Sequence, residues 1–408
     1  MTSGRPLEGV TVVEVSSWMF IPAAGAVLAD WGATVLKVEH PETGDPQRGL
    51  VTSGLLPGGA DGVNFMMEQP NRGKQSVGVD IADPDGHEAL MRLVEGADVF
   101  LTNYLPHVRE KLRIDVDHLR ARNPDIIVAR GTGQGTRGPD AWRGGYDAAS
   151  FWARGGVASV MPDRNGWPPG QPAPAFGDVM GGMSTAGAIA AALFQRSNTG
   201  ETSTVDVSLL ATAMWQVSPL VVASKLFGFS KIPTTGDRPM TDNPGVGTYR
   251  TADGRYIGLV LLQADRFWAE LVTKLDVPEL ATDERFADTE ARKHNLEACV
   301  TALDDAFGAR PLSHWREVLA DFSGVWAPYQ NLDELYEDPQ VIANGYLPTM
   351  TAANGQDVQL VANPAQFDEQ PVEITRGPDH GEHTDEALLA LGYTWDDLIA
   401  LKQSGAIL

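Results

Sequence analysis

A single acid, Asp178, stands among glycines where a carboxylate could react with a ligand. The segment FGDVMGG places Gly177, Gly181 and Gly182 around it, and glycines remove side chains that would keep a bulky ligand away. From Ser184 the residues become small and apolar, which predicts a helix with Asp178 near its N-terminus. The partial positive charge of that helix end would favour the ionised carboxylate, which is the form that a nucleophile needs. The same position also suits a helix N-cap or a turn residue, so this segment alone leaves both interpretations open.

Several other kinds of site lack their motifs. No G-x-G-x-x-G follows the first predicted strand, and no G-x-S-x-G, P-loop or H-E-x-x-H occurs, which argues against NAD, serine-hydrolase, nucleotide and zinc-protease chemistry. The eight histidines are scattered, and the cluster at 379–385 is interpreted as the polar start of a helix, so we expect no metal site. Cys299 is the single cysteine, which excludes an internal disulfide and fits a core position in a protein of the reducing cytosol.

The composition is that of a globular protein with room for two domains. The chain has 408 residues, of which 43% are hydrophobic and 21% charged. Its net charge of −23 argues against nucleic acid or an anionic membrane as a partner. The most apolar run, 205–224, contains Asp206, Gln216 and Pro219, and the N-terminus has no basic region followed by an apolar one. We therefore expect a cytoplasmic protein without a membrane partner.

The first half of the chain alternates strand and helix patterns. Buried-strand patterns at 10–15, 33–39, 97–103 and 126–130 are separated by helical ones, which predicts a doubly wound, Rossmann-like α/β domain with a parallel sheet. Such sheets bind ligands at the carboxyl ends of their strands. That edge would hold the loop after the first strand, with Trp18, and the polar residues after later strands, Asn103, Tyr104, Tyr146 and Asp147.

The pattern changes beyond about Lys225. A loop rich in proline and glycine leads to TYRTADGRYIGLVLL, which is typical of a β-hairpin around Asp253 and Gly254. Helical stretches follow, so we predict a smaller α+β domain over 223–334 after a large domain over 1–222.

Nine segments, in order, resemble one family of enzymes. They are PLEGVTVVEV, LADWGATVLKVEHPETGDPQRG, NRGKQSVGVD, ADVFLTNY, GYDAAS, FGDVMGG, TADGRYIGLV, EDPQVIANG and GEHTDEAL. Together they resemble the class III CoA transferases, the CaiB/BaiF group, which includes the α-methylacyl-CoA racemases. The resemblance implies that 335–408 returns to complete the large domain and that two chains interlock as a homodimer.

The resemblance places Asp178 at the family's catalytic aspartate. It implies that this carboxylate attacks the thioester of a donor acyl-CoA, and that an aspartyl anhydride and an aspartyl-CoA thioester carry the CoA to an acceptor carboxylic acid. Coenzyme A and acyl-CoA are then substrates, and no tightly bound cofactor is expected.

The resemblance also implies a CoA site. Basic side chains there would meet the phosphates of CoA, although the chain as a whole is acidic. Many family members carry an arginine at the position of His40 in this chain. The implied cofactor-binding residues are Trp18, His40, Arg72, Lys74, Asn103, Tyr104 and Lys111.

Departures from the family pattern separate transfer from racemisation. Racemases of the group keep an acid/base histidine where this chain has Tyr146, and a phenol holds its proton near pH 7. Asp147 is adjacent and could orient a water or a hydrogen bond, and the racemase glutamate falls near Gln263. Some transferases carry glutamine at Met19, so its replacement indicates an apolar pocket for a hydrophobic or aromatic acid. CoA transfer is the first hypothesis; a racemase or isomerase of the same fold and an idle CoA-binding relative are the alternatives.

Overall fold

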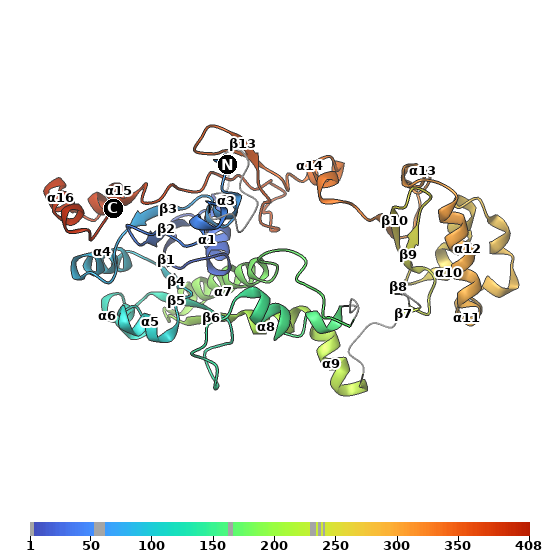
Figure 1. The fold of residues 1–408 in the computed structure, drawn as a ribbon, viewed down its shortest axis with the longest axis horizontal. Coiled ribbons are helices and arrows are strands. Elements are labelled where there is room, and N and C mark those ends of the chain that lie inside the picture. Colours follow the sequence, from blue (N-terminus) through green and yellow to red (C-terminus); the bar gives the residue numbers. More distant parts are fainter. Residues whose placement is uncertain (1–3, 53–61, 162–165, 229–233, 236–237, 240) are drawn as a thin grey trace. The chain divides into compact units, whose positions relative to one another are not determined.

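The chain forms two compact units. The computed structural model describes residues 4–52, 62–161, 166–228, 234–235, 238–239 and 241–408 (Figure 1). One unit comprises 1–229 together with 339–408, and the other comprises 230–338, against predicted boundaries after 222 and 334. Each unit has its own hydrophobic core.

The larger unit is built on a six-stranded sheet in the order β3-β2-β1-β4-β5-β6. All five strand pairs are parallel, and the register matches Val12 of β1 with Val35 of β2 on one side and with Val99 of β4 on the other. The predicted α/β architecture with a parallel sheet is confirmed. The chain order reverses between β1 and β4. The strands are β1 (Thr11–Val15), β2 (Thr34–Glu39), β3 (Gln75–Gly78), β4 (Val99–Thr102), β5 (Ile127–Thr132) and β6 (Thr204–Ser208).

Both faces of this sheet are apolar because successive strand residues point to opposite sides. Val12, Leu101 and Ala129 pack against α1 (Phe20–Asp30), α7 (Asp178–Thr199) and α8 (Leu209–Gln216). The opposite set includes Val13, Phe100 and Val128 and is covered by four other helices (Figure 1). These are α4 (Pro84–Glu95), α6 (Val116–Arg122), α15 (Thr384–Ala390) and α16 (Trp395–Ser404).

The C-terminal segment of the chain packs beside β3. The backbone N–H of Leu408 donates to the Gly78 carbonyl at 3.0 Å, and Ile407 pairs with Val79. The remaining elements of this unit are short: α2 (Arg48–Thr52), α3 (Phe65–Asn71), α5 (Pro106–Lys111), the π-helix η2 (Ala148–Ala153), the 3₁₀ turn η3 (Ala158–Val160), α9 (Ser218–Phe227), α14 (Pro339–Ala343), β12 (Thr349–Thr351) and β13 (Asp357–Gln359).

The smaller unit packs helices on a three-stranded antiparallel sheet, β11-β10-β9. The predicted hairpin is present, and Gly254 takes a left-handed φ of 78° in its turn. Cys299 is fully buried in this core, as predicted. The elements are β7 (Thr234–Thr235), β8 (Arg238–Pro239), β9 (Val246–Arg250), β10 (Tyr256–Val260), α10 (Ala264–Lys274), η4 (Pro278–Ala281), η5 (Glu284–Phe286), α11 (Thr289–His294), α12 (Leu296–Gly308), α13 (Leu312–Val318), β11 (Trp326–Pro328) and η6 (Leu332–Tyr336).

Within the described residues, no single helix has the length and apolar composition needed to cross a membrane. Among the described helices, α8 and α9 pass that test together, as a pair bent by 69°.

Candidate active site

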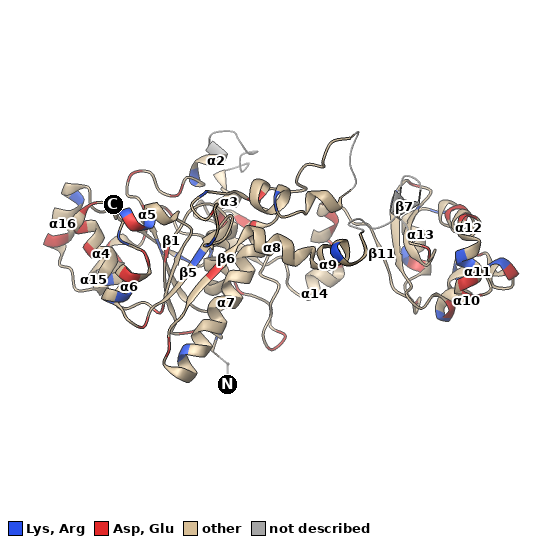
Figure 2. Ribbon diagram, turned by 90° about the horizontal axis from the view of Figure 1, so that it is seen from below, with Lys and Arg blue, Asp and Glu red and all other residues tan. Residues whose placement is uncertain are grey.

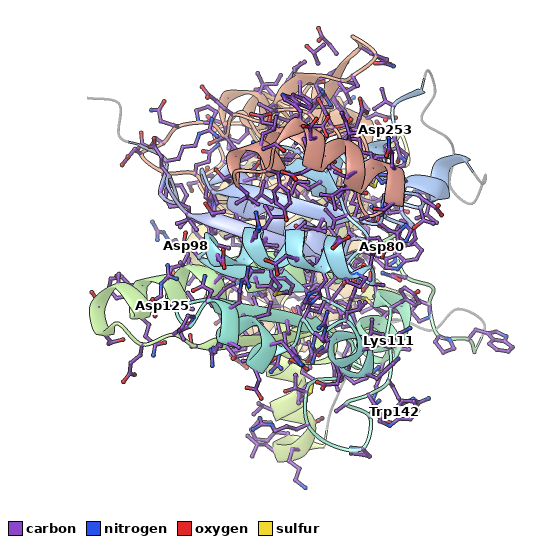
Figure 3. The ribbon with its side chains drawn as sticks, turned by 90° about the vertical axis from the view of Figure 1, so that its left-hand side faces the viewer. Asp80, Asp98, Lys111, Asp125, Trp142 and Asp253 are labelled. Carbon is purple, nitrogen blue, oxygen red and sulfur yellow. The ribbon has the colours of Figure 1, made fainter. Side chains whose placement is uncertain are left out.

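A cavity of about 490 Å³ opens at the carboxyl ends of β1, β4 and β5. It lies where the chain order of the sheet reverses, which is the usual ligand site of doubly wound sheets. Figure 3 shows Lys111 and Trp142 toward this edge, whereas Asp98 and Asp125, which precede β4 and β5, lie at the opposite edge. The predicted site residues in its wall are Trp18, Asn103, Tyr104, Tyr146 and Asp178.

Asp178 is the first residue of α7 and is half-buried in the cavity wall. The helix begins here, six residues before the apolar pattern at Ser184 that predicted it. Burial, and then the neighbouring charge of Asp147, raise the pKa of Asp178 to about 7. The helix terminus was expected to favour the ionised form, whereas burial and the charge of Asp147 both favour the protonated form. Near neutral pH this carboxyl exists in both protonation states.

Asp147 lies behind Asp178 and does not line the cavity. The backbone N–H of Gly177 donates to both of its carboxylate oxygens, at 3.0 and 3.1 Å, and the Gln171 amide donates as well. Burial raises the pKa of Asp147, while these hydrogen bonds act to lower it. Asp147, predicted among the catalytic residues, thus holds the backbone of Gly177, the residue directly before Asp178.

The glycines around Asp178 serve close packing. A Cβ atom on Gly177 would lie 2.2 Å from the Phe151 ring, and one on Gly181 would lie 2.5 Å from the Phe20 ring. A Cβ atom on Gly182 would approach that of Ala23, on α1, to 2.7 Å. The prediction that these glycines open space for a ligand is wrong, because α1 and η2 occupy that space.

Two aromatic rings meet in the wall of the cavity. Tyr146 is 66% exposed, and its ring meets the Trp18 ring edge to face with 5.8 Å between centroids. Trp18 has a left-handed backbone, with φ of 71°. The two rings give an aromatic surface to the cavity that Asp178 also lines.

Asn103 and Tyr104 follow β4 and shape the loop after β1. The Asn103 side chain accepts the Ser17 N–H at 3.1 Å and donates to the Ser17 carbonyl at 2.7 Å. The buried Arg109 donates to the Tyr104 carbonyl at 2.6 Å, and burial raises the pKa of the Tyr104 phenol. The amide of Asn103 is thus hydrogen-bonded to the backbone of Ser17. Asn103 also lines the cavity, where its predicted contact with CoA would be made.

Two of the predicted phosphate-binding side chains form ion pairs inside the larger unit. Arg72 is buried, and its guanidinium pairs with Asp30 at 2.7 Å. Lys74 is fully buried, with its ammonium 2.7 Å from Glu14 and 2.8 Å from the Pro22 carbonyl that accepts its hydrogen bond. Both predicted phosphate-binding side chains are therefore paired with acids inside the unit, and neither lines the cavity.

The other two predicted phosphate-binding side chains are exposed but do not line the cavity. His40 lies 3.9 Å from Asp80, and Lys111 ends α5 without an ion pair to any described residue. Sequence reasoning missed Arg143, a cavity residue whose side chain is 58% exposed and pairs with Asp140 at 3.3 Å. Its place in the glycine-rich loop after β5 is the signal that could have found it.

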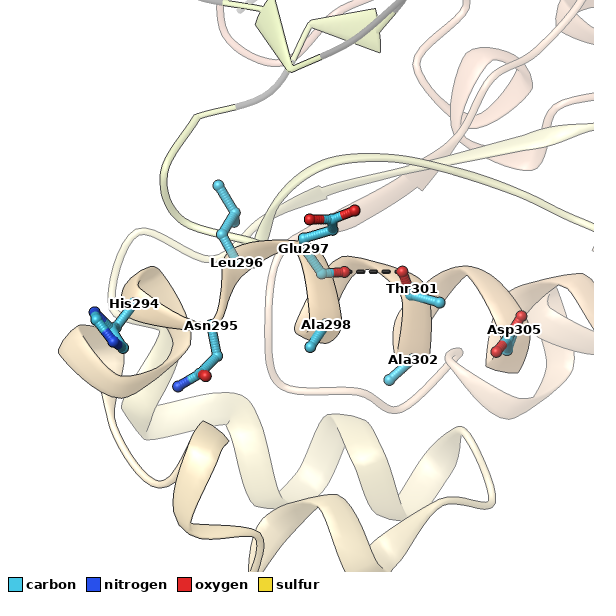
Figure 4. Close-up of a pocket in the computed structure, with 8 residues that line it drawn as sticks. All are labelled: His294, Asn295, Leu296, Glu297, Ala298, Thr301, Ala302 and Asp305. Atoms are coloured by element: carbon cyan, nitrogen blue, oxygen red, sulfur yellow. Dashed lines mark hydrogen bonds between the residues drawn. The ribbon is translucent and has the colours of Figure 1, made fainter.

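Within the part of the chain that the structure describes, neither the distribution of charges nor a hollow in the smaller unit points to another site. Lys and Arg are interspersed with Asp and Glu along the helices in Figure 2. A hollow of about 560 Å³ lies along one face of the smaller unit at α11 and α12, where Thr301 donates to the Glu297 carbonyl at 2.8 Å (Figure 4). No strand ends converge among its described lining residues, which are His294, Asn295, Leu296, Glu297, Ala298, Thr301, Ala302 and Asp305.

The family follows from a match along nearly the whole chain. The model of CoA-transferase family III matches residues 7–384. The chain belongs to CoA-transferase family III. The cavity lined by Asp178, Asn103 and Tyr104 is therefore the candidate active site of a CoA transferase.

Relatives in this family act on different acids. The (R)-2-hydroxy-4-methylpentanoate CoA-transferase of Clostridioides difficile is 31% identical, over 98% of this chain and 99% of its own. The succinate–glutarate CoA-transferase of Agrobacterium fabrum is 32% identical, over 95% and 96%. A crystal structure of a CaiB/BaiF family protein from Brucella suis, 29% identical, superposes with a TM-score of 0.79 over 95% of this chain and 100% of its own. The protein is thus a CoA-transferase enzyme, and its acid is not fixed by the family.

Proposed function

We propose that Asp178 is the nucleophile of this CoA transferase. Its carboxylate attacks the carbonyl carbon of a donor acyl-CoA, the C–S bond breaks, and an aspartyl anhydride and free CoA thiolate result. The thiolate then attacks the aspartyl carbonyl, which releases the donor acid and leaves an aspartyl-CoA thioester. The observation that carries this role is a half-buried carboxyl in the wall of a cavity at the reversal point of the sheet.

The second half of the reaction repeats these steps with the acceptor. The acceptor carboxylate attacks the aspartyl thioester and expels CoA thiolate, which forms a second anhydride. The thiolate attacks the acceptor carbonyl, so the new acyl-CoA leaves and Asp178 is regenerated. Each bond formed is matched by one broken, and no oxidant or metal is needed.

The raised pKa of Asp178 suits this role. A carboxylate with a higher pKa is a stronger base than an ordinary one, and at a pH above about 7 it is mostly ionised. The hold of Asp147 on Gly177 keeps the turn fixed while the anhydride and thioester form.

Three exposed side chains near this edge are left to bind the phosphates of CoA. Arg143 lines the cavity, and Lys111 and His40 are exposed on segments that follow β4 and β2. We assign the phosphates of CoA to these groups in place of Arg72 and Lys74, and we keep Trp18, Asn103 and Tyr104 as cavity contacts. CoA binds as a substrate.

The cavity favours an apolar acid. Hydrocarbon and aromatic groups dominate its wall, which includes Trp18, Phe20, Tyr104, Leu105, Pro106, Val108, Tyr146 and Leu209. Arg143 is the one lysine or arginine among the described wall residues, and Asp140 already pairs with it. A dicarboxylate such as glutarate would bury its second charge here at a cost, whereas the branched chain of 2-hydroxy-4-methylpentanoate would replace water favourably.

A panel of acids tests this function. With an apolar donor such as 4-methylpentanoyl-CoA, we expect CoA transfer to 2-hydroxy-4-methylpentanoate or phenyllactate with kcat/KM at least about tenfold above that to glutarate. Asp178→Ala, which removes the nucleophile and leaves a small side chain, abolishes transfer. A preference for glutarate would contradict the apolar pocket, and transfer by Asp178→Ala within about tenfold of wild type would contradict the nucleophile.

An exposed apolar surface supports the proposed interlocked homodimer. Trp215 on α8 is 78% exposed and Phe227 on α9 is 74% exposed, and α9 has no buried residue in the single chain. Exposed apolar side chains on neighbouring helices are typical of an interaction surface, so a second copy of the chain is proposed to cover them. Sedimentation at micromolar concentration gives a dimer on this account, and a monomer would contradict it.

A further inference from the structure

Four charged side chains are sealed inside the larger unit directly behind the loop that follows β1. The Lys37 ammonium lies 3.2 Å from Glu14 and 2.9 Å from Asp45, and the Lys74 ammonium lies 2.7 Å from Glu14. The side chains of all four residues are fully buried. Glu14, Lys37, Asp45 and Lys74 are called the buried charge cluster below.

A buried charge cluster is a poor way to stabilise a fold. Moving charged groups out of water costs free energy, and the attraction between the buried charges often only offsets that cost. Apolar residues of similar volume often stabilise a fold as well or better. The cluster pairs two acidic side chains with two lysines. The role of the cluster is therefore sought in the residues that it contacts and not in its contribution to stability.

The cluster grips the loop after β1 at successive residues. Lys37 donates to the Ser16 carbonyl at 3.1 Å, and the Ser16 hydroxyl donates to Glu14 at 2.9 Å. The Trp18 N–H donates to Asp45 at 3.1 Å. Together with the hold of Asn103 on Ser17, these bonds fix each residue from 16 to 18.

Trp18 needs such a hold because its backbone is unfavourable for its side chain. Its φ of 71° lies in the left-handed region, where a Cβ atom crowds the following carbonyl and where bulky residues are rare. Backbones of this kind persist only where the surroundings enforce them, and they gather at functional sites. The conformation places Trp18 in the cavity wall with its ring against Tyr146.

We propose that Asp45 is a positioning residue for CoA transfer, which holds Trp18 in its left-handed conformation and so sets the aromatic wall beside Asp178. This rests on the proposed function, since it assigns the cavity to the reacting acyl group. Asp45 is well placed for the role because it is itself fixed. Its backbone N–H donates to Glu39 at 2.9 Å, and the carboxylate oxygen that accepts from Trp18 also accepts the Gln47 N–H at 3.0 Å.

Asp45→Asn probes this role with little change of volume. The Asp45 carboxylate turns one oxygen to Trp18 and Gln47 and the other to Lys37. An amide has a single oxygen, so it cannot serve both sides, and the hold on Trp18 or the pair with Lys37 is lost. Asp98→Asn is the matched control, because it removes the partly buried partner of Arg196 at the opposite edge of the sheet (Figure 3).

A double-mutant cycle with Trp18→Gly separates positioning from plain destabilisation. Glycine adopts the left-handed backbone without help, and it has no ring to place. We expect Asp45→Asn to lower kcat/KM about tenfold or more in the chain with Trp18 and less than about threefold in the Trp18→Gly chain. The melting temperature should fall by a similar amount in both, and Asp98→Asn should leave kcat/KM within about twofold of wild type.

Crystal structures of the variant give a readout that does not depend on the acid. In Asp45→Asn we expect Trp18 to leave the left-handed region and its ring contact with Tyr146 to be lost. An unchanged Trp18 backbone, or equal activity losses in both chains, would overturn the proposal. Absence of CoA transfer by the wild-type enzyme would instead contradict the proposed function. Should Asp45→Asn fail to fold, Lys37→Met combined with Asp45→Asn, which removes one charge of each sign, is measured in the same way.

Discussion

Both carboxylate oxygens of Asp147 accept the backbone N–H of Gly177, the residue directly before Asp178. This bond joins the start of η2 to the start of α7 and brings a second carboxylate close to Asp178. The same residue therefore orients the proposed nucleophile and raises its pKa. The two effects can be separated by experiment.

Asp147→Asn should move the acid limb of the pH profile. In the wild-type enzyme the ionised Asp178 forms near pH 7, so kcat/KM should rise through that pH. Asparagine removes the like charge, which lowers the pKa of Asp178, although burial, the larger cause, remains. We expect the midpoint of the limb at a lower pH, measured with a constant donor and acceptor. A midpoint that stays in place or moves upward would show that Asp147 does not tune Asp178.

Asp178→Asn should stabilise the protein in alkali and not in acid. The pKa of Asp178 is about 7 in the folded chain, against 3.8 as its ordinary value, so the folded state binds the proton more tightly. Its contribution to stability is thus fully present below about pH 4 and is lost as the pH rises through 7. Allowing for the partial exposure of the side chain, we expect the variant to gain on the order of 1–3 kcal/mol at pH 8. Urea unfolding at pH 4.5 and pH 8 measures this, and an equal change at both would contradict it.

The sequence predicted the sheet well, because each strand is a short apolar run and each crossover a periodic one. It also predicted Trp18, Asn103, Tyr104, Tyr146 and Asp147 at one edge, since the carboxyl ends of parallel strands meet there, and all of these except Asp147 line the cavity. These inferences need only local pattern and topology.

The roles of charged residues and glycines could not be predicted in this way. The partners of Arg72 and Lys74 are Asp30 and Glu14, which lie far away in the sequence and meet them only in the folded chain. The aromatic neighbour that requires Gly177 is likewise distant, as Phe151 lies on η2. Contacts between residues far apart in the sequence determine the ion pairs and the need for glycine, and a local sequence pattern does not predict such contacts.

Transfer and racemisation can be told apart by exchange with solvent. Tyr146 is exposed, and the resemblance to the family implies that it replaces the acid/base histidine of the racemases, so the imidazole that would exchange the proton is missing. We expect little or no exchange of the α-hydrogen when a 2-methylacyl-CoA is incubated with the enzyme in D₂O, under conditions that give CoA transfer to an acid. Rapid deuterium uptake with loss of chirality, and no transfer to any acid of the panel, would favour the racemase.

The central claim is that Asp178 carries the acyl group and then CoA in covalent form. The direct measurement is to mix the enzyme with an apolar acyl-CoA, quench with hydroxylamine, and determine by peptide mass spectrometry which side chain is modified. Hydroxylamine converts an aspartyl anhydride or thioester to a hydroxamate. The account predicts a hydroxamate on Asp178 in the wild-type enzyme and none in Asp178→Ala. CoA transfer that proceeds while Asp178 stays unmodified at every time point would contradict it.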